Sequence, residues 1–484
     1  MNNIEIHSQD PANLSQPFST PFFASNQVVE SSNIYATLER NLVPDWERLR
    51  EMVNAAPGNL TITINSYNVG TETALADIVA GTVTNATLVI SDVRRPGVEG
   101  GSNDILYAEG GQIVVGGAGT ITIQGANSNI ELRRMNPETN PGRHFAVQAG
   151  AILSINNITL HGNRTIDDPA SIGFSGGVTV SGVFEMHTGA VIRNNAAQLG
   201  GGVAIFDGQF SATAGSITNN IAEQFGGGIY ASGSNIVITN STINGNRTSY
   251  DGGGLSAVDS NLTITNSIIS NNEAGRDGGG IWVNSSELTI TDNTIVSANQ
   301  AVEHGGGIAL LWGNEATITN SEISGNVSHR SGGIMVQDSD LIVIASEINN
   351  NIALSGFGGG ILVNWQSNAI ITDSTISDNG AMYGGGIFVS ASELTVSNSI
   401  VNNNRAYTGN GGGIYVQSGT AAISTSEISD NEAARYGGGI YLMSSSNLTI
   451  NDSTISSNRA ADGGGIALLW SSEATIINSE TSHR

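Results

Sequence analysis

Residues 435–470 read RYGGGIYLMSSSNLTINDSTISSNRAADGGGIALLW, and this stretch contains one whole repeat of the pattern that decides the fold. Three glycines and an isoleucine begin a short apolar run, Asn458 follows, and three glycines then return. The hydrophobic residue after each glycine group lies at Val178, Val203, Ile229, Leu255, Ile281, Ile308, Ile334, Ile361, Ile387, Ile414, Ile440 and Ile466. The period is about 26 residues, which predicts a solenoid rather than separate globular domains.

Within each repeat the apolar residues alternate with polar ones. Ile281-Trp282-Val283 and Leu288-Thr289-Ile290 show this period of two, which is typical of short strands and not of helices. Three short strands that return to the same phase every repeat form one coil of a parallel β-helix. The predicted fold class is therefore all-β, with coils that stack at ~4.8 Å and bury one another's apolar side chains.

The repeated glycines and asparagines have a physical explanation in such a stack. A turn that needs a positive φ, or a backbone too close to its neighbour for a Cβ atom, requires glycine in every coil. An asparagine precedes each glycine group, at Asn195, Asn220, Asn246, Asn272, Asn299, Asn326, Asn351, Asn379, Asn404, Asn431 and Asn458. Stacked asparagine side chains can form a hydrogen-bonded ladder and tolerate a left-handed turn.

The charge and composition exclude several classes of partner. The formal net charge is −25, and all 17 basic residues are arginine. Nucleic acids and anionic membranes are bound through clustered basic side chains, so we expect neither as a partner. Cysteine is absent, which excludes thiolate metal sites and thiol catalysis. No apolar run approaches the ~18 residues of a membrane span, so no membrane insertion is expected from this segment.

The repeat divides the chain into four predicted regions. Residues 1–30 are polar and are expected to be a disordered or processed tail, and residues 31–57 should hold a short N-terminal capping helix with Leu42, Trp46, Leu49 and Val53 on one face. Residues 58–177 are predicted to form irregular coils, and residues 178–484 regular ones. Residues 463–484 nearly copy residues 305–330 but stop inside a coil, so we expect a C-terminal truncation.

The repeat resembles that of a known family. The stretches IISNNEAGRDGGGIWV and EISDNEAARYGGGIYL are similar to the GGA(I/L/V) and FxxN repeats of polymorphic outer membrane proteins. They also resemble adhesin-like right-handed β-helix proteins of the pectin-lyase superfold. The resemblance covers about residues 140–484, with GGG in place of GGA, and implies a right-handed helix, an extracellular or cell-surface location, and adhesion.

Aromatic residues cluster around the glycines. The residue after the inward isoleucine is expected to point outward, and it is aromatic at Tyr230, Trp282, Phe388, Tyr415 and Tyr441. Phe225, Phe357, Tyr383 and Tyr436 immediately precede glycines, and Trp312, Trp365 and Trp470 lie four positions after the isoleucine in other coils. Such rings could stack on sugar rings or on a protein partner, and we take the first five together with Tyr383 and Tyr436 as candidate ligand-binding residues. They could equally be ladder positions that favour aromatic side chains for β-structure.

Charged residues gather in the column before the glycines. Asp251, Asp277 and His304 follow one another there, with Arg276 and Glu303 beside them. Two carboxylates at ~5 Å, one coil apart, could hold Ca²⁺ or act as a retaining glycosidase pair. They could also be a solvated acidic patch in a variable loop. Asp251, Asp277, Arg276 and His304 are thus the candidate catalytic residues, and Asp251 and Asp277 the candidate calcium ligands; no other cofactor is expected.

Three functions remain open at this point, and one of them is a purely structural spacer or phage-type fibre segment. The first is an adhesin-like, cell-surface or secreted protein without catalytic activity, whose partner is a surface glycan or a protein of a host or neighbouring cell. The second is a carbohydrate-active enzyme of the pectin-lyase superfold, either a polysaccharide lyase or a glycoside hydrolase. The uniform step of 25 to 27 residues between glycine groups favours the first, because enzymes of this superfold usually insert long loops that form a cleft.

Overall fold

The computed structural model describes residues 142–162 and 177–483 and, before them, the strands β1 to β8. The chain forms two compact units, unit 1 (Met1–Asn195 and Gly208–Gly215) and unit 2 (Ala196–Asp207 and Ser216–Arg484). The described residues form strands and turns and contain no helix. Among them, accordingly, no helical segment has the length and apolar character needed to cross a bilayer.

Unit 2 is a parallel β-helix in which each coil passes through four sheets, named C, A, B and D in chain order. Sheet C follows the glycines and contains β16 (Val203–Phe206), β20 (Ile229–Ser232), β24 (Leu255–Val258), β28 (Ile281–Asn284), β32 (Ile308–Leu311), β36 (Ile334–Gln337), β40 (Ile361–Asn364), β44 (Ile387–Ser390), β48 (Ile414–Gln417), β52 (Ile440–Met443) and β55 (Ile466–Leu468). Sheet A contains β21 (Asn235–Thr239), β25 (Asn261–Thr265), β29 (Glu287–Thr291), β33 (Glu315–Thr319), β37 (Asp340–Ile344), β41 (Asn368–Thr372), β45 (Glu393–Ser397), β49 (Thr420–Ser424), β53 (Asn447–Asn451) and β56 (Glu473–Ile477).

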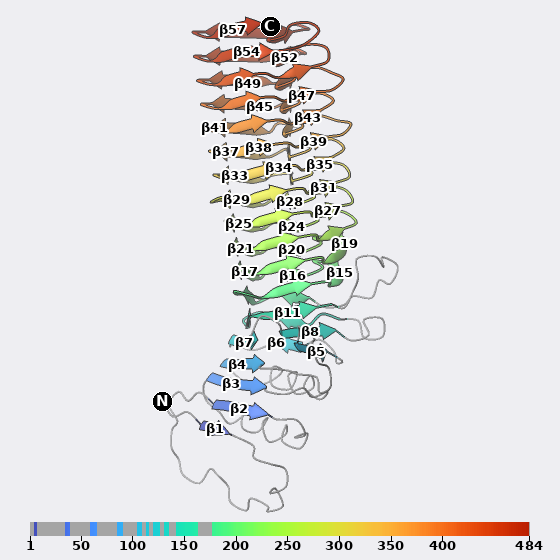
Figure 1. Ribbon diagram of the computed structural model, residues 1–484, viewed down its shortest axis with the longest axis vertical. Helices are drawn as coiled ribbons and strands as arrows, with labels where there is room; N and C mark the ends of the chain where they lie inside the picture. Colours follow the sequence, from blue (N-terminus) through green and yellow to red (C-terminus); the bar gives the residue numbers. More distant parts are fainter. Residues whose placement is uncertain are drawn as a thin grey trace, which may run out of the picture. The chain divides into compact units, whose positions relative to one another are not determined.

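The other two sheets complete each coil. Sheet B contains β18 (Ser216–Thr218), β22 (Thr242–Asn244), β26 (Ile268–Ser270), β30 (Ile295–Ser297), β34 (Glu322–Ser324), β38 (Glu347–Asn349), β42 (Thr375–Ser377), β46 (Ile400–Asn402), β50 (Glu427–Ser429), β54 (Thr454–Asn458) and β57 (Glu480–His483). Sheet D contains β15 (Ala196–Leu199), β19 (Ile221–Phe225), β23 (Arg247–Thr248), β27 (Glu273–Ala274), β31 (Gln300–Ala301), β35 (Val327–Ser328), β39 (Ile352–Ala353), β43 (Gly380–Ala381), β47 (Arg405–Ala406) and β51 (Glu432–Ala433). Figure 1 shows the coils of unit 2 stacked one on another, with the loops beyond sheet D on one side.

Unit 1 is built from parallel pairs as well. Its strands are β1 (Ile4–Ile6), β2 (Ile34–Leu38), β3 (Asn59–Ile64), β4 (Asn85–Ile90), β5 (Asp104–Ala108), β6 (Ile113–Val115), β7 (Thr120–Gly125), β8 (Ile130–Arg134), β9 (Phe145–Val147), β10 (Ile152–Asn156), β11 (Ile158–His161), β12 (Val178–Val180), β13 (Val183–Met186), β14 (Val191–Arg193) and β17 (Gln209–Thr213). They pair in the orders β1-β2-β3-β4-β7-β10-β13-β17, β5-β8-β11-β14 and β6-β9-β12. The predicted capping helix, with Leu42, Trp46, Leu49 and Val53, lies outside the described residues.

The core of unit 2 consists of one inward side chain at every second strand position. Ile281 and Val283 of sheet C, Leu288 and Ile290 of sheet A, and Val296 of sheet B are all fully buried. Each meets its counterpart in the next coil, because the strands pair in register, as Ile281 does with Ile308. The predicted all-β parallel β-helix with about 26 residues per coil is confirmed, and the period-two pattern marks its buried face.

The three glycines of each group have different roles. Gly278 has φ +64°, a left-handed conformation that a side chain would strain. A Cβ atom on Gly279 would lie 2.3 Å from the carbonyl oxygen of Gly306 in the next coil. One on Gly280 would lie 2.7 Å from the Gly307 oxygen and 3.0 Å from Nδ2 of Asn299. The first glycine is needed for its conformation, and the second and third for the close approach of two coils.

The predicted asparagine ladder is confirmed in unit 2. Nδ2 of Asn299 donates to Oδ1 of Asn326 at 3.0 Å and to the carbonyl oxygen of Ile269 at 2.9 Å, and its backbone N–H also donates to Oδ1 of Asn326. The same bonds continue from Asn220 to Asn458. The left-handed residue is, however, the one before the ladder position, such as Ala298 with φ +54°. The ladder asparagine itself is held by its side-chain bonds.

Candidate functional site

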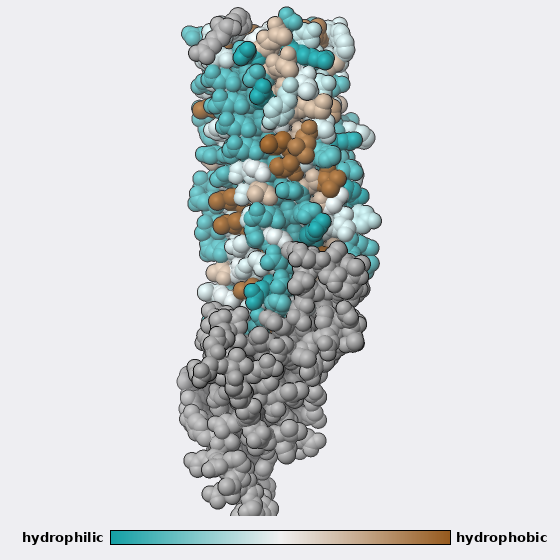
Figure 2. Space-filling view, turned by 45° about the vertical axis from the view of Figure 1, so that its right-hand side comes forward, coloured by the Kyte–Doolittle hydropathy of each residue, from teal (hydrophilic) through white to brown (hydrophobic). Residues whose placement is uncertain are grey.

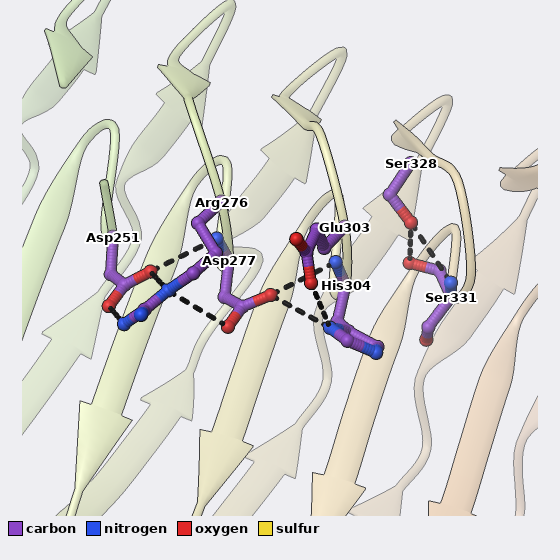
Figure 3. A network of polar contacts seen from close by, with 7 residues as sticks. All are labelled: Asp251, Arg276, Asp277, Glu303, His304, Ser328 and Ser331. Atoms are coloured by element: carbon purple, nitrogen blue, oxygen red, sulfur yellow. Dashed lines mark hydrogen bonds and ion pairs between the residues drawn. The ribbon is translucent and has the colours of Figure 1, made fainter. Parts of the chain in front are cut away.

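The charged column lies on the loops between sheet D and the glycines. Asp251 is fully buried, and its carboxylate accepts hydrogen bonds from Nε of Arg276 at 2.8 Å and from an Arg276 terminal nitrogen. The backbone N–H of Asp277 donates to the same carboxylate at 3.1 Å. Figure 3 shows the Arg276 guanidinium lying along Asp251 and reaching towards Asp277, whose Oδ2 is 3.6 Å from Nε. Arg276 therefore joins the two aspartates into one ion-pair network.

The next step of the column pairs Asp277 with His304. Oδ1 of Asp277 is 2.8 Å from Nδ1 of His304 and accepts the backbone N–H of His304 at 3.1 Å. Glu303 reaches the same histidine, with Oε2 4.0 Å from Nδ1. The side chain of Asp277 is nearly buried, that of His304 is 20% exposed, and that of Glu303 is 54% exposed. The predicted stacking of Asp251, Asp277 and His304 in one column is confirmed.

This geometry changes the chemistry expected of the two aspartates. A retaining glycosidase pair needs two carboxylates that both reach the substrate. Asp251 cannot, because it is buried beneath its bidentate contact with Arg276. The same contact occupies the oxygens that a calcium ion would need. The glycosidase or calcium-binding role of Asp251 and Asp277 stays a prediction that this arrangement disfavours, because Arg276 contacts both side chains.

A different trio reaches solvent through His304 and Glu303, while its third member, Asp277, is nearly buried. One ligand atom each from Asp277, Glu303 and His304 lies within 4.8 Å of the others, so these residues could hold a cation. An imidazole nitrogen with two carboxylates suits zinc, iron or manganese better than calcium, which prefers oxygen ligands alone. The carboxylate-oriented imidazole could also act as a general base. The cluster is therefore suited to bind a transition-metal cation or to accept a proton from a substrate.

Burial and pairing have opposite effects on Asp251. Burial raises the pKa of Asp251 above its ordinary value, although the Arg276 guanidinium lowers it, while the hydrogen bond to Asp251 raises the pKa of Arg276. The folded state therefore binds a proton at Asp251 more tightly than the unfolded state does. The stability that this proton provides is complete below the unfolded pKa of about 3.9 and is lost as the pH rises through the folded pKa.

Replacing Arg276 by glutamine is expected to destabilise the coils around it by about 1–3 kcal/mol at neutral pH, since the fully buried Asp251 carboxylate loses its charged donor. The loss should shrink at acid pH, where Asp251 is protonated. Urea unfolding of the variant at pH values from neutral to acid measures both effects. The double variant Asp251→Asn/Arg276→Gln should regain part of the loss, and equal losses in the single and double variants would contradict the pairing.

The predicted ring column lies on the outer side of sheet C but is not exposed. Trp282, Phe388, Tyr415 and Tyr441 are only 4–5% exposed, and Tyr230 is half-buried. The rings that precede the glycines cover them. Phe357 lies 4.6 Å from Phe388 between ring centroids, and the corresponding distance is 6.2 Å for both Tyr383–Tyr415 and Tyr436–Tyr441.

These aromatic residues form a second apolar layer with Ala309, Leu311, Met335 and Leu362. Burial there raises the pKa values of Tyr415 and Tyr441, because the ionised phenolate would have little solvent around it. The expectation that the column presents exposed ring faces is therefore wrong for these four positions. The physical reason is that rings at the end of sheet D and in the loops after it, such as Phe225, Phe357 and Tyr383, pack against the outer face of sheet C. Among the candidate residues, Tyr436 keeps a substantial exposed fraction, 37%.

The exposed tryptophans lie elsewhere, at the corner between sheets C and A. Trp312, Trp365 and Trp470 are 47%, 65% and 68% exposed. Their recurrence four positions after the isoleucine is visible in the sequence, but their exposure is decided by the corner, where the chain turns away from the core. The face of the described residues that Figure 2 shows is mainly hydrophilic, with separate hydrophobic patches.

A family model agrees with this architecture. The model of the family described as right handed beta helix region matches residues 177–314 and 306–481. No curated protein sequence matches the chain. A similar solved structure is the crystal structure of the periplasmic alginate epimerase AlgG, with 13% identity over 92% of this chain and 84% of that chain and a TM-score of 0.33. The two family matches span more than half of the sequence, and the chain belongs to the right-handed β-helix family.

Proposed function

We propose that the protein is an adhesin-like, cell-surface or secreted binding protein that presents the repeated outer positions of its coils to a ligand. The observation that carries this proposal is the strict register of those positions. In sheet A, Thr263 pairs with Thr289 and Thr289 with Thr317, so threonine occupies this outward position in three successive coils. Consecutive ladder asparagines in unit 2 are 25 to 28 residues apart, so the spacing of outer positions hardly varies.

A repeated surface of this kind favours extended ligands. Contacts that are individually weak multiply when one ligand molecule touches several coils, because the later contacts are intramolecular. The ligand we propose is a surface glycan or a protein of a host or neighbouring cell. The net charge of −25 disfavours polyanionic ligands. The resemblance to polymorphic outer membrane proteins and adhesins supports both adhesion and a location outside the cytoplasm.

The test is binding of the purified chain to an array of neutral, cationic and anionic glycans and to intact cells. Released reducing or unsaturated ends are measured in the same samples, with calcium and with a chelator. Binding without turnover in both conditions is the expected result. Turnover of any glycan would contradict a purely binding function. If the chain binds neither a glycan nor cells, the binding function itself is contradicted.

A second candidate function is favoured by one observation, the Asp277–His304 pair with Glu303 beside it. An imidazole held by a carboxylate could abstract a proton in a polysaccharide lyase or activate water in a glycoside hydrolase. In that case the turnover should be lost in His304→Gln. The matched control is His329→Gln on the loop of the next coil. Equal turnover in the two variants would exclude His304 as the catalytic base.

A further inference from the structure

Three tryptophans at the sheet C to sheet A corner have no evident role in folding. Of the described tryptophans, Trp282 is buried, whereas Trp312, Trp365 and Trp470 keep about half or more of their side-chain surface exposed. The residue before the corner in the first of these coils, Leu311, is 4% exposed, so burial ends where the tryptophan begins. An indole left in water contributes little hydrophobic stabilisation.

The backbone at these corners is also unfavourable for a large side chain. Two successive residues adopt positive φ at each one: Trp312 and Gly313 at +63° and +73°, Trp365 and Gln366 at +57° and +58°, and Trp470 and Ser471 at +53° and +58°. The left-handed conformation is strained for an L-residue with a side chain. Glycine or asparagine would fit with less strain. Other residues with side chains, such as Ala298 and Thr425, adopt the same conformation in this chain, so the exposure of the indoles, and not their backbone, distinguishes these corners.

The chain itself shows that the corner does not require tryptophan. Ser444 and Ser445 form the same corner, with φ +63° and +60°. These corners have three residues between the strands of sheets C and A, as residues 312–314, 365–367 and 444–446 show, whereas Asp338 and Ser339 fill a neighbouring corner alone. The three-residue corner is thus a structural variant of the coil that forms with or without tryptophan.

The three indoles stand in one column at even coil intervals. The corners are linked by backbone hydrogen bonds from coil to coil, from Gly313 N–H to Asp338 O and from Asp338 N–H to Trp365 O. Trp312 and Trp365 are two coils apart, and Trp365 and Trp470 four coils apart. At ~4.8 Å per coil the separations are about 10 Å and about 19 Å. The first is the length of two linked sugar rings, and the second is twice that length.

We propose that Trp312, Trp365 and Trp470 form a binding stripe for a linear, uncharged, β-linked polysaccharide that lies along the stack of coils. This inference rests on the proposed binding function and specifies its ligand. In such a polymer the same ring face recurs at every second sugar, which matches indoles placed at even coil intervals. The apolar C–H face of a sugar stacks on an indole, and its hydroxyl groups need hydrogen-bonding neighbours.

Those neighbours are present at the corners. Asn364 and Gln366 flank Trp365, and Gln337 lies opposite Asn364 in the preceding coil. Their amides can donate to and accept from sugar hydroxyls. The acidic net charge repels uronate polymers, so a neutral glycan is the ligand class that fits both the rings and the charge.

The test is the dependence of affinity on ligand length, measured by calorimetry with β-1,4-linked gluco-oligosaccharides and with hydroxyethylcellulose. One sugar per coil means that three rings reach from Trp312 to Trp365, and seven rings also reach Trp470. The affinity should therefore rise in two steps, at three and at seven rings. Each single Trp→Asn variant should weaken hydroxyethylcellulose binding about fivefold. The triple variant should lose about a hundredfold.

Two control variants show whether the indoles act by contacting the glycan or by supporting the fold. Tyr407→Ala removes an exposed ring on the loop side of sheet D and should leave the affinity unchanged. Trp365→Asn should keep or raise the thermal midpoint, because asparagine tolerates the left-handed backbone. A lowered midpoint would show that the indole has a structural role and would overturn the inference.

Other outcomes are equally decisive. The proposed binding stripe is overturned if the wild-type chain does not bind these neutral glycans. It is also overturned if the affinity rises with ligand length without steps, or if the triple variant binds as tightly as the wild type. If the wild-type chain then binds a cell-surface protein or another glycan, the proposed binding function stands without the stripe. If it binds no glycan and no cell, both fail.

Discussion

Replacing Asn326 by alanine is expected to raise the local opening of the neighbouring coils more than almost any other single truncation in unit 2. Asn326 is fully buried, and Nδ2 donates to Oδ1 of Asn351 and to the Val296 oxygen at 3.0 Å and 2.9 Å. Its Oδ1 accepts the backbone N–H and the side-chain amide of Asn299. Alanine would leave the buried backbone N–H of Asn299 without its acceptor and would remove one of the bonds made by the side chains of Asn299 and Asn351. Since each loss costs about 1–3 kcal/mol, the total should be about 3 kcal/mol or more.

The measurement is amide hydrogen exchange along unit 2, because each coil contacts mainly its neighbours and opens locally. Protection should fall in the coils of Asn299, Asn326 and Asn351 and recover further away. Asn349→Ala is the matched control, since Asn349 lies on the outer side of sheet B, where substitutions cost about 0.5 kcal/mol or less. Similar protection losses in the two variants would contradict the role of the ladder.

Gly279→Ala is expected to have a comparable or larger effect for a different reason. Its φ is not positive, so alanine brings no conformational strain of its own. The added Cβ atom would instead lie 2.3 Å from the Gly306 oxygen and 2.5 Å from the Gln300 oxygen. Both are backbone atoms of the adjacent coil, so the coils must separate and the bond from Gly279 N–H to the Gly305 oxygen must weaken. Overpacking of this kind should cost about 3 kcal/mol or more.

Gly325→Ala provides the contrast that tests this reasoning. Gly325 has φ +61°, but a Cβ atom there would have the backbone nitrogen of Ala298, 3.9 Å away, as its nearest neighbour. Only the left-handed conformation opposes alanine here, at about 1 kcal/mol. The urea midpoint should therefore fall much further for Gly279→Ala than for Gly325→Ala. The opposite order would mean that backbone conformation, and not close approach, selects the glycines.

The sequence determined the fold because the physical causes are local and repeated. The period of about 26 residues fixes the coil, and the alternation in Ile281-Trp282-Val283 and Leu288-Thr289-Ile290 fixes which side chains face the core. The asparagine column predicted the ladder correctly, since identical residues in register meet their own copies. The sequence of one coil therefore suffices to predict the core and ladder contacts between all neighbouring coils.

The tertiary structure decided which outer residues are exposed and which charges are free. Trp282 and Tyr415 point away from the core as the alternation predicts, yet they are buried. Phe225, at the end of a sheet D strand, packs against Trp282, and Tyr383, in the loop after sheet D, packs against Tyr415. Arg276 donates to the Asp251 carboxylate, a contact between residues 25 positions apart that the repeat does not predict. Strand periodicity specifies the face on which a side chain lies, but it carries no information about what covers that face.

The corner tryptophans show the same division. The spacing of the corner tryptophans is visible in the sequence. Because Trp365 and Trp282 are the same residue type, however, the sequence does not show which of them is exposed. Only the fold shows that one lies at a widened left-handed corner in water and the other beneath Phe225, with ring centroids 6.2 Å apart. The sequence thus determined the repeating coil, its core and its ladder, whose contacts are set by register. The path of the loops, a non-local property of the chain, decided the exposed surface and hence the candidate sites.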